Sequence, residues 1–537
     1  MLQPRRSLET TAAPGPQERQ TKLRHGTPTK NRNALAALLL SIAILFSGSA
    51  LAQQYGGNLT IGLDTEPSAL APWRSGDANA HRVYTAIYET LVMQYDSLAI
   101  TPGLAHDWDA SDDGLTYTFH LVEGITFHNG EAFNADAVAW NFDWWMNAPA
   151  GYLVSVSGVA GTEVIDEYTI AVTLEAPNSR FLITLANHTQ AILPPQAVEE
   201  QGEDFGFQPV GTGPFMFERW LSDSEIALVR NPDYWRTAEN GDSLPYLDTV
   251  TYRILPDAST RHTALVIGDI DLDVTISPSN VADIESRSGF TVFNEPGVGY
   301  MGLRMLTTAE PFTDVRVRQA VSWAIDREAI NQAAYFGLAE TGSGMYSPTT
   351  PAYDPDFDPY SPRDLEKARE LLDEAGYSGG FDMEIIVAVP LFQIVAEVLQ
   401  AQLAEVGVRV SVVVVERGTF LDGIVSRDWH SFVDSLTGRV DPYDYYGHLE
   451  CDALYNGHDY CNEVVDQMAM HDGVSNYTDL LDPERIELYE EAVRMVIEDA
   501  PLAVILYPPM LYAWNSDIHD LVVNPAGRLQ YMETWKE

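Results

Sequence analysis

Apolar residues in the first half of the chain recur with two different spacings. Where every second residue is apolar, the pattern predicts a strand with one buried face, and apolar residues three and four positions apart predict a helix. No internal repeat with a fixed short period is present. The expected elements are strands over Asn58–Leu63 and Tyr117–Leu121, helices over Thr85–Leu91 and Ala135–Met146 with Asn134 as N-cap, and a hairpin over Glu163–Leu174 that turns near Asp166-Glu167.

The second half is more regular. Met383–Val389 predicts a strand, Phe392–Val406 a helix, and Val408–Val415 a second strand. This order is a βαβ unit, whose two strands should run parallel in one sheet, and the apolar run of the second strand is typical of a strand buried on both faces. Two further helices are expected, one capped by Thr313 with Val317, Ala320, Val321, Ala324 and Ile325 at helical spacing, and one over Leu365–Ala375 followed by Gly376. The fold class is therefore α/β, with sheets covered by helices.

The first 52 residues have the pattern of a secretory signal peptide. A basic stretch ends in Lys30 and Arg32, an apolar run covers residues 34–46, and Ala50-Leu51-Ala52 supplies the small residues of a cleavage site. The run is too short to span a membrane, so we expect cleavage after Ala52 and export to the periplasm.

No cysteine lies near the cleavage site, so a lipoprotein is not expected. The longest later apolar run, residues 385–406, is interrupted by Pro390, Glu397 and Glu405. The mature chain is therefore expected to be soluble outside the cytoplasm.

The charge of the chain is extreme. It has 31 basic and 78 acidic side chains, for a net charge of −47. The segment before Gln53 holds seven of the basic and two of the acidic residues, which leaves 24 basic and 76 acidic residues and a charge of −52. Such a surface repels phosphates, which excludes nucleic acid and anionic membranes as partners. Because the acids are spread along the chain, we interpret them as an adaptation to high salt.

Five segments, in the same order along the chain, resemble the family-five extracellular solute-binding proteins of ABC importers. This family includes dipeptide-, oligopeptide- and nickel-binding proteins. The likeness runs from about Gly57 to the C-terminus. The segments are GGNLTIGLDTEPSALAP (56–72), VYTAIYETLVMQ (83–94), residues 104–140 with FHNG at 127–130, GTGPFMFERW (211–220) with NPDYW (231–235), and FTDVRVRQAVSWAIDREAI (312–330).

The resemblance implies a two-lobed periplasmic-binding-protein fold with a hinge of two crossing strands. Lobe one would take residues 53–294 and 507–537, with a small subdomain at about 90–205, and lobe two would take residues 295–506. Ligand would lie in the cleft, and hinge closure would bury it. The partners implied are a small peptide or peptide-like solute and an ABC permease and ATPase at the inner membrane; a monomer without cofactor is expected.

One part of the family pattern is changed in this chain. In the peptide-binding members, an aspartate of the second lobe pairs with the α-ammonium of the ligand, and the matching stretch here runs from Ser435 to Pro442 through Thr437. Gly438 stands at the aspartate position and Arg439 follows it, a version that resembles glutathione- and modified-peptide-type binders. We expect Arg439 to hold a ligand carboxylate and Asp441 to hold Arg439 or meet an ammonium; the alternative is an intramolecular salt bridge.

Further candidates for the cleft are chosen because aromatic side chains supply contact area without demanding one hydrogen-bond pattern. They are Trp73 and Arg74 after the first loop, Tyr300 at a crossing, Met345 and Tyr346 in a glycine-rich loop, and Tyr443 after Asp441-Pro442.

Cys451 and Cys461 are the only cysteines, and they flank the turn dipeptide Asn456-Gly457. In an oxidising compartment a disulfide is expected, although His448 and His458 would complete a zinc-like set with them. No metal site is therefore assigned.

The function expected is that of a substrate-binding protein, not an enzyme. The one G-x-S-x-G match, Gly376–Gly380, follows the expected helix over Leu365–Ala375 and not a strand, so it is not a nucleophile elbow, and no metalloprotease motif is present. The alternatives are a binder of an opine, an oligosaccharide or a nickel chelate, a ligand-sensing partner of a membrane receptor, or a secreted hydrolase with paired carboxylates.

Overall fold

The computed structural model describes residues 53–94, 99–149, 151–154, 156–437, 441–446, 449, 451, 456–473, 481–524 and 526–537. The expected signal peptide lies outside these residues. Residues from Gln54 to Glu537 form one unit. Among the described residues, no helix combines the length and the apolar character needed to span a bilayer.

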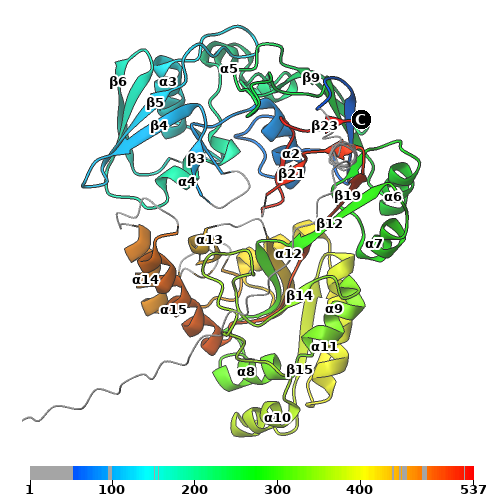
Figure 1. Ribbon diagram of the computed structural model, residues 1–537. Helices are drawn as coiled ribbons and strands as arrows, with labels where there is room; N and C mark the ends of the chain where they lie inside the picture. The colour runs from blue at the N-terminus through cyan, green and yellow to red at the C-terminus, as the bar shows by residue number, and fades with distance from the viewer. Residues whose placement is uncertain are drawn as a thin grey trace, which may run out of the picture. The chain divides into compact units, whose positions relative to one another are not determined.

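Strand β1 (Asn58–Leu63) lies inside a seven-stranded mixed sheet and runs parallel to both of its neighbours. Leu59, Ile61 and Leu63 are buried, as the alternating sequence predicts. The part of the molecule built on this sheet is called lobe one (Figure 1). The strand order is β12 (Phe290–Pro296), β19 (Pro509–Asn515), β11 (Leu272–Asp273), β1, β10 (Thr249–Ile254), β9 (Glu225–Arg230) and β8 (Phe215–Leu221).

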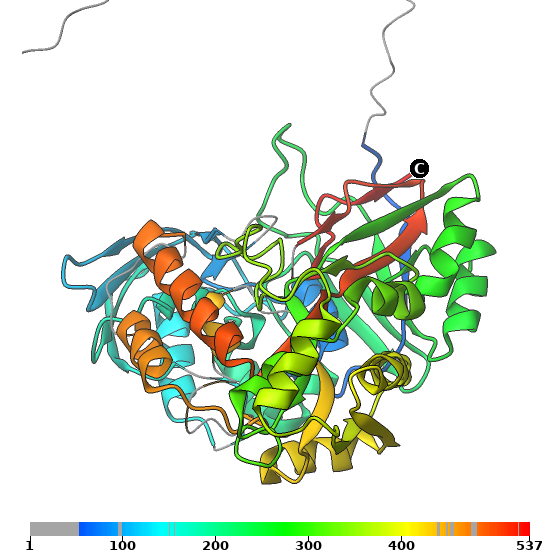
Figure 2. The same cartoon turned by 90° about the horizontal axis from the view of Figure 1, so that it is seen from below.

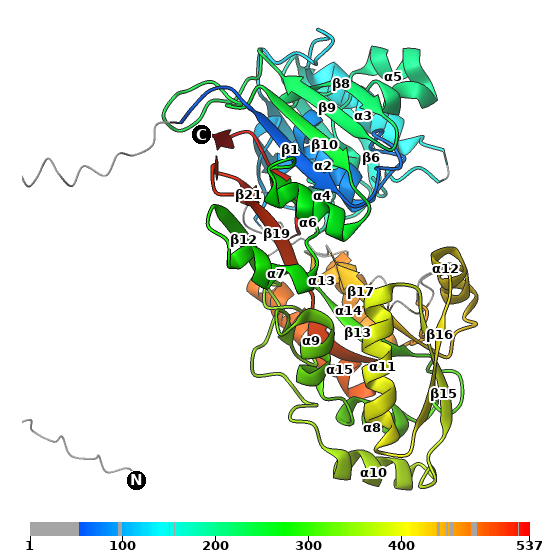
Figure 3. The ribbon, with the colours of Figure 1, turned by 90° about the vertical axis from the view of Figure 1, so that its right-hand side faces the viewer.

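A six-stranded sheet forms the centre of the second part, called lobe two. Strands β15 and β16 are parallel and joined by helix α11 (Pro390–Ala404), which confirms the predicted βαβ unit; α11 lies along this sheet in Figure 3. Strand β16 is at the edge, with Val414 58 % exposed, so the prediction of a strand buried on both faces is wrong. The order is β14 (Glu340–Thr341), β18 (Leu502–Tyr507), β13 (Gly299–Met305), β17 (Ser431–Thr437), β15 (Asp382–Val387) and β16 (Arg409–Val414).

The chain passes between the two large sheets at two adjacent places. One connection, Gly297-Val298, joins β12 to β13, and the other, Pro508, joins β18 to β19. β12 pairs with β19, and β13 pairs with β18. The two connections are themselves joined, because the Gly297 amide donates to the Pro508 carbonyl at 3.1 Å.

A four-stranded antiparallel sheet with helix α3 (Ala135–Met146) extends lobe one. Its strands, in order across the sheet, are β4 (Ala105–Ala110), β5 (Thr116–Leu121), β7 (Thr169–Leu174) and β6 (Val159–Asp166). The side chain of Asn134 accepts from the Ala137 amide at 3.0 Å and caps α3, as predicted.

The starts of helices α2 and α8 differ from the prediction. Helix α2 (Ala78–Ile87) begins seven residues before the expected Thr85, because the Asp77 side chain accepts from the Ala80 amide and starts the helix there. Helix α8 (Val315–Trp323) is capped by Asp314 instead of Thr313. In both cases a carboxylate takes the capping position.

The other helices cover the sheets. In Figure 2, α14 and α15 (orange) lie side by side, in agreement with their contacts. The remaining helices are α4 (Phe181–Leu185), α5 (Pro195–Gln201), α6 (Ala258–Val266), α7 (Pro278–Glu285), α9 (Arg327–Tyr335), α10 (Leu365–Glu374), α12 (Arg417–Ser426), α13 (Pro442–Tyr446), α14 (Glu463–Gly473) and α15 (Pro483–Asp499), with short 3-10 helices at His188–Gln190 and Gly202–Phe207.

Candidate functional site

A cleft of about 860 Å³ lies where the chain passes between the sheets. Lobe one contributes Arg82 and Arg528 to its walls, lobe two contributes Tyr335, Leu391 and Thr437, and the two connections form part of its lining. A second hollow of about 350 Å³ adjoins it, since both are lined by Leu153, Asn187, Thr189 and Arg528. Each of the two volumes lies within the range of small-molecule sites.

Arg82 is held in the cleft wall by neutral groups. Helix α2 presents it, and its guanidinium donates to Asn79 Oδ1 at 2.6 Å and to the Tyr512 hydroxyl at 3.4 Å. The Tyr512 hydroxyl in turn donates to the Gly527 carbonyl at 3.0 Å. Tyr512 thus connects Arg82 to the loop that carries Arg528.

Arg528 follows the turn of a hairpin near the C-terminus. Strands β21 (Val522–Val523) and β22 (Leu529–Gln530) pair, and the Arg528 amide donates to Asn524 Oδ1 at 2.8 Å. Gly527 has a φ of +74°, a conformation that glycine adopts readily. Burial lowers the pKa of Arg528. No described side chain forms an ion pair or hydrogen bond with its guanidinium.

Two histidines lie beside this arginine. The rings of His81 and His188 are 6.5 Å apart, centroid to centroid, and neither Nδ1 has a hydrogen-bond partner among the described residues. Burial and then the charge of Arg528 lower the pKa of His81 to about 4 and that of His188 well below its usual value. Both imidazoles are therefore neutral at pH 7.

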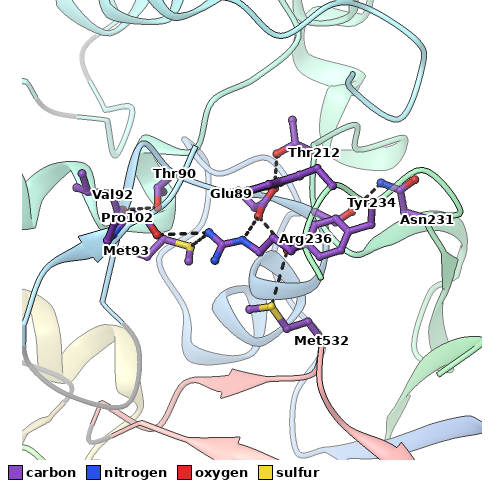
Figure 4. A network of polar contacts seen from close by, with 12 residues as sticks. Glu89, Thr90, Val92, Met93, Pro102, Thr212, Asn231, Tyr234, Arg236 and Met532 are labelled. Carbon is purple, nitrogen blue, oxygen red and sulfur yellow. Dashed lines mark hydrogen bonds and ion pairs between the residues drawn. The ribbon is translucent and has the colours of Figure 1, made fainter. Parts of the chain in front are cut away.

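Behind the cleft wall, Glu89 forms the centre of a buried polar network (Figure 4). Its carboxylate accepts from Thr212 at 2.9 Å, Trp235 at 2.9 Å and Tyr234 at 3.0 Å, and Arg236 Nε lies 3.4 Å away. Burial raises the pKa of Glu89, against the opposing effect of Arg236. Helix α2 ends at Ile87, with Tyr88 in an extended conformation, so the predicted continuation of the helix to Leu91 is wrong.

A cavity of about 40 Å³ lies beside this network and is lined by Glu89, His188 and Arg528. Glu89 is the one carboxylate among its described lining residues. Because both oxygens of Glu89 already accept hydrogen bonds, this carboxylate serves the interior of lobe one rather than the cleft arginine.

An ion pair spans the second hollow. Arg180, just before α4 in lobe one, lies 2.6 Å from Asp444 of α13 in lobe two. The Arg180 guanidinium also lies over the Tyr443 ring, 4.0 Å from its centroid. This contact joins the lobes at a position distant in the sequence from the two connections.

The predicted site residues of lobe two are divided between the cleft and the core. Thr437 lines the cleft, and Tyr443 lies under Arg180. Tyr300, Met345 and Tyr346 are buried in a core cluster. Gly438 and Arg439 lie outside the described residues, so the expected grip of Arg439 on a carboxylate stays a prediction.

Asp441 is fully buried and bound within lobe two. Its Oδ1 accepts from Arg485 Nη2 at 2.6 Å and from the Tyr443 amide at 2.8 Å. Both side chains of the ion pair have an exposure of 0 %. An internal partner therefore already holds the carboxylate that we expected near a ligand.

The candidates of lobe one lie away from the cleft lining. Trp73 is buried against Trp144 and Phe205. Arg74 pairs with Glu203 and lies over Tyr152. Neither residue lines the cleft or the adjoining hollow.

Cys451 and Cys461 form a disulfide. His458, the described histidine of the zinc-like alternative, lies against Arg304 with its Nδ1 3.3 Å from Nη1. Within the described residues, no group of three or more His, Cys, Asp and Glu side chains could hold a metal ion.

The residues that the sequence did not single out are Arg82, Arg528, His81 and His188. A signal was present, because the stretches 78–88 and 521–532 contain a basic residue and no acid in a chain that is otherwise dense in carboxylates. The signal is not specific, because residues 176–198 also contain one arginine, Arg180, and no acid, and Arg180 pairs with Asp444.

The chain is similar to bacterial solute-binding proteins in sequence. Residues 99–453 match the model of the bacterial extracellular solute-binding proteins, family 5. The glutathione-binding protein GsiB of Escherichia coli O1:K1 is 32 % identical over 393 residues, which are 72 % of this chain and 74 % of GsiB. GsiB of Salmonella typhimurium is 33 % identical over 389 residues, with the same coverage.

Solved structures agree with the sequence comparison. The periplasmic binding protein DppA of Helicobacter pylori, in complex with the peptide STSA, has a TM-score of 0.77 and 28 % identity, covering 90 % of this chain and 99 % of DppA. The substrate-binding protein CtaP of Listeria monocytogenes has a TM-score of 0.81 and 25 % identity, covering 90 % of this chain and all of CtaP. The two-lobed α/β fold expected from the sequence is confirmed, and the chain belongs to the family-5 bacterial extracellular solute-binding proteins.

Proposed function

We propose that this protein captures a peptide or peptide-like solute in the cleft between its lobes and delivers it to the permease and ATPase of an ABC importer. The observation that carries the proposal is the cleft itself, about 860 Å³ in volume and lined by both lobes and by their two connections. Opening and closing about two short connections is a known route for ligand capture. The proposal includes binding and no catalytic step.

The relatives support peptides as the first solutes to test. GsiB is named for glutathione, and the DppA structure holds the peptide STSA. A dipeptide-binding protein of Pseudoalteromonas holds Met-Leu, and AgaA of Agrobacterium, at 25 % identity, holds agropinic acid. An opine is therefore the second class.

The finer parts of the proposal come from the sequence. We propose export after cleavage behind Ala52, a periplasmic location without a lipid anchor, and a monomer. The lobe boundaries proposed are residues 53–294 with 507–537, and residues 295–506. β12 pairs in the first sheet through Pro296 and β18 in the second through Tyr507, which supports boundaries close to these positions.

The test is calorimetric titration of the mature protein with glutathione, Met-Leu, Ser-Thr-Ser-Ala and agropinic acid. We expect at least one peptide to bind with one molecule per chain and to reduce the radius of gyration in solution scattering as the lobes close. Binding of agropinic acid alone would replace the peptide by an opine, and consumption of a peptide into products would contradict a role in binding only.

A further inference from the structure

In this acid-rich protein, the described lining of the 860 Å³ cleft has an unusual charge. The mature chain has 76 acidic and 24 basic residues, yet the described residues that line the 860 Å³ cleft include no Asp or Glu. The charged side chains there are Arg82 and Arg528. Among the charged residues of this composition, acids outnumber bases by about three to one, so the charge of the described cleft lining is opposite in sign to that of the rest of the chain.

The two arginines also differ from most of the others. Arginines such as Arg230, Arg304 and Arg485 pair with carboxylates. Arg318 and Arg327 donate to backbone carbonyls instead. Within the part of the chain that the structure describes, Arg82 has only neutral partners and the Arg528 side chain has none.

Three carboxylates near this place are already bound. Asp77, which faces His81, accepts from the Ala80 amide and from Ser68 and Ser75. Asp444 pairs with Arg180, and Glu89 accepts from three side chains of lobe one. Neutralising Arg528 from within would require one of these networks to break.

Leaving a partly buried guanidinium unpaired costs stability, because the charge loses water without gaining a partner. A bound carboxylate repays this cost, since the planar fork of arginine matches two carboxylate oxygens. The Arg528 amide donates to Asn524 Oδ1 and the Tyr512 hydroxyl donates to the Gly527 carbonyl, so the hairpin of Arg528 is held in place before a ligand arrives.

We infer that Arg528, supported by Arg82, binds a carboxylate of the ligand, so that the solute captured by this protein is a free acid. This inference rests on the proposed function and names the chemical class of its solute. His81 and His188 lie beside Arg528 as neutral groups and add no charge to this place. The site lies on lobe one, on a different lobe from the expected contact of Arg439.

The experiment compares matched acids and neutral derivatives by titration calorimetry: glutathione with its diethyl ester, and Met-Leu with Met-Leu amide. The proteins are the unchanged chain, Arg528→Gln, Arg528→Lys, and the control Arg253→Gln, which removes an arginine paired with Asp269. We expect the acids to bind about tenfold or more tightly than their derivatives. Arg528→Gln should remove this difference, Arg528→Lys should keep part of it, and Arg253→Gln should keep all of it. Equal affinity for acid and derivative, or an unchanged preference in Arg528→Gln, would overturn the inference.

The inference and the proposed function can fail separately. If no peptide or opine binds, the proposed function is wrong, and citrate at constant ionic strength still tests the anion site. A larger rise of the melting temperature for the unchanged chain than for Arg528→Gln supports the site, and equal rises overturn it. If the neutral derivatives bind as well as the acids, the result supports peptide capture and contradicts the carboxylate site.

Discussion

Two arginines in this molecule differ in whether their positive charge is paired with a carboxylate. Arg485 is fully buried in lobe two and pairs with the equally buried Asp441 at 2.6 Å. Arg528 lies in the cleft wall of lobe one, and no described side chain pairs with it. A buried charge that stabilises the fold is paired with an opposite charge of the same chain. A buried charge that binds a ligand has no such internal partner, because the ligand supplies it.

The largest loss of stability is expected when the paired arginine, Arg485, is replaced. Arg485→Met leaves the Asp441 carboxylate buried without its cation, so the free energy of unfolding should fall by about 3–5 kcal/mol. Urea denaturation measures this loss. The matched control Arg253→Gln removes an exposed pair and should change it by at most about 1 kcal/mol. Similar small losses in both variants would remove the distinction between the two kinds of site.

The pH dependence of the free energy of unfolding tests the surroundings of Arg528 through its neighbour His81. His81 has a pKa of about 4 in the folded protein against about 6.5 when unfolded. Between these two pH values the unfolded chain binds more protons than the folded protein. The contribution of neutral His81 to the free energy of unfolding is therefore complete above pH 6.5 and is lost as the pH falls towards 4. From pH 7.5 to pH 5, His81 should account for a loss of about 2 kcal/mol.

Urea denaturation at the two pH values, with the unchanged chain and His81→Gln, measures this contribution. The loss on acidification should be smaller in the variant. Because His128 has a pKa lowered to about 4 by burial, part of the loss remains, and His128→Gln provides a matched comparison away from Arg528. An identical loss with and without His81 would show that this histidine is not held neutral.

The ion pair between the lobes should contribute more to ligand affinity than to the free energy of unfolding. Arg180 and Asp444 are partly exposed, so removing their contact should cost at most about 1 kcal/mol. Arg180→Gln and Asp444→Asn should each weaken binding of the tightest peptide several-fold, and the double variant should be no weaker than either. Additive losses in this cycle would show that the two side chains act independently.

The smallest effect expected is on the association rate. Residues 53–537 carry a net charge of −52, which repels an anionic solute at long range, and salt screens that repulsion. In stopped-flow measurements, binding of an acidic peptide should therefore become a few-fold faster as ionic strength rises, while its neutral amide should change little. A slower association of the acid at high salt would mean that the cleft arginines dominate the field outside the cleft.

The elements that follow from local pattern were predictable. The βαβ unit around α11 and the cap at Asn134 depend on residues close in the sequence, and the structure contains both. The exposure of β16 was not predictable from its apolar run, because its edge position depends on which strands pair with β15. The start of α2 was missed because Asp77, and not periodicity, determines it.

The site was harder to predict than the fold. Sequence comparison directed attention to the stretch around Asp441, whose carboxylate is bound to Arg485, 44 residues further along the chain. Whether an arginine is paired depends on contacts between distant segments, as with Arg82 and Tyr512, 430 residues apart. The absence of acids around residues 78–88 and 521–532 was visible in the sequence, but their meeting in one cleft was not.

The most direct test of the difference between the two arginines is urea denaturation of Arg528→Gln, with and without a saturating amount of the tightest free acid among glutathione, Met-Leu and Ser-Thr-Ser-Ala. Without the acid, the variant should be as stable as the unchanged chain or more stable, because an unpaired charge has been removed. With the acid, the unchanged chain should gain more stability than the variant. A variant that is destabilised without ligand and gains as much from the acid would contradict the account, since Arg528 would then serve the fold as Arg485 does.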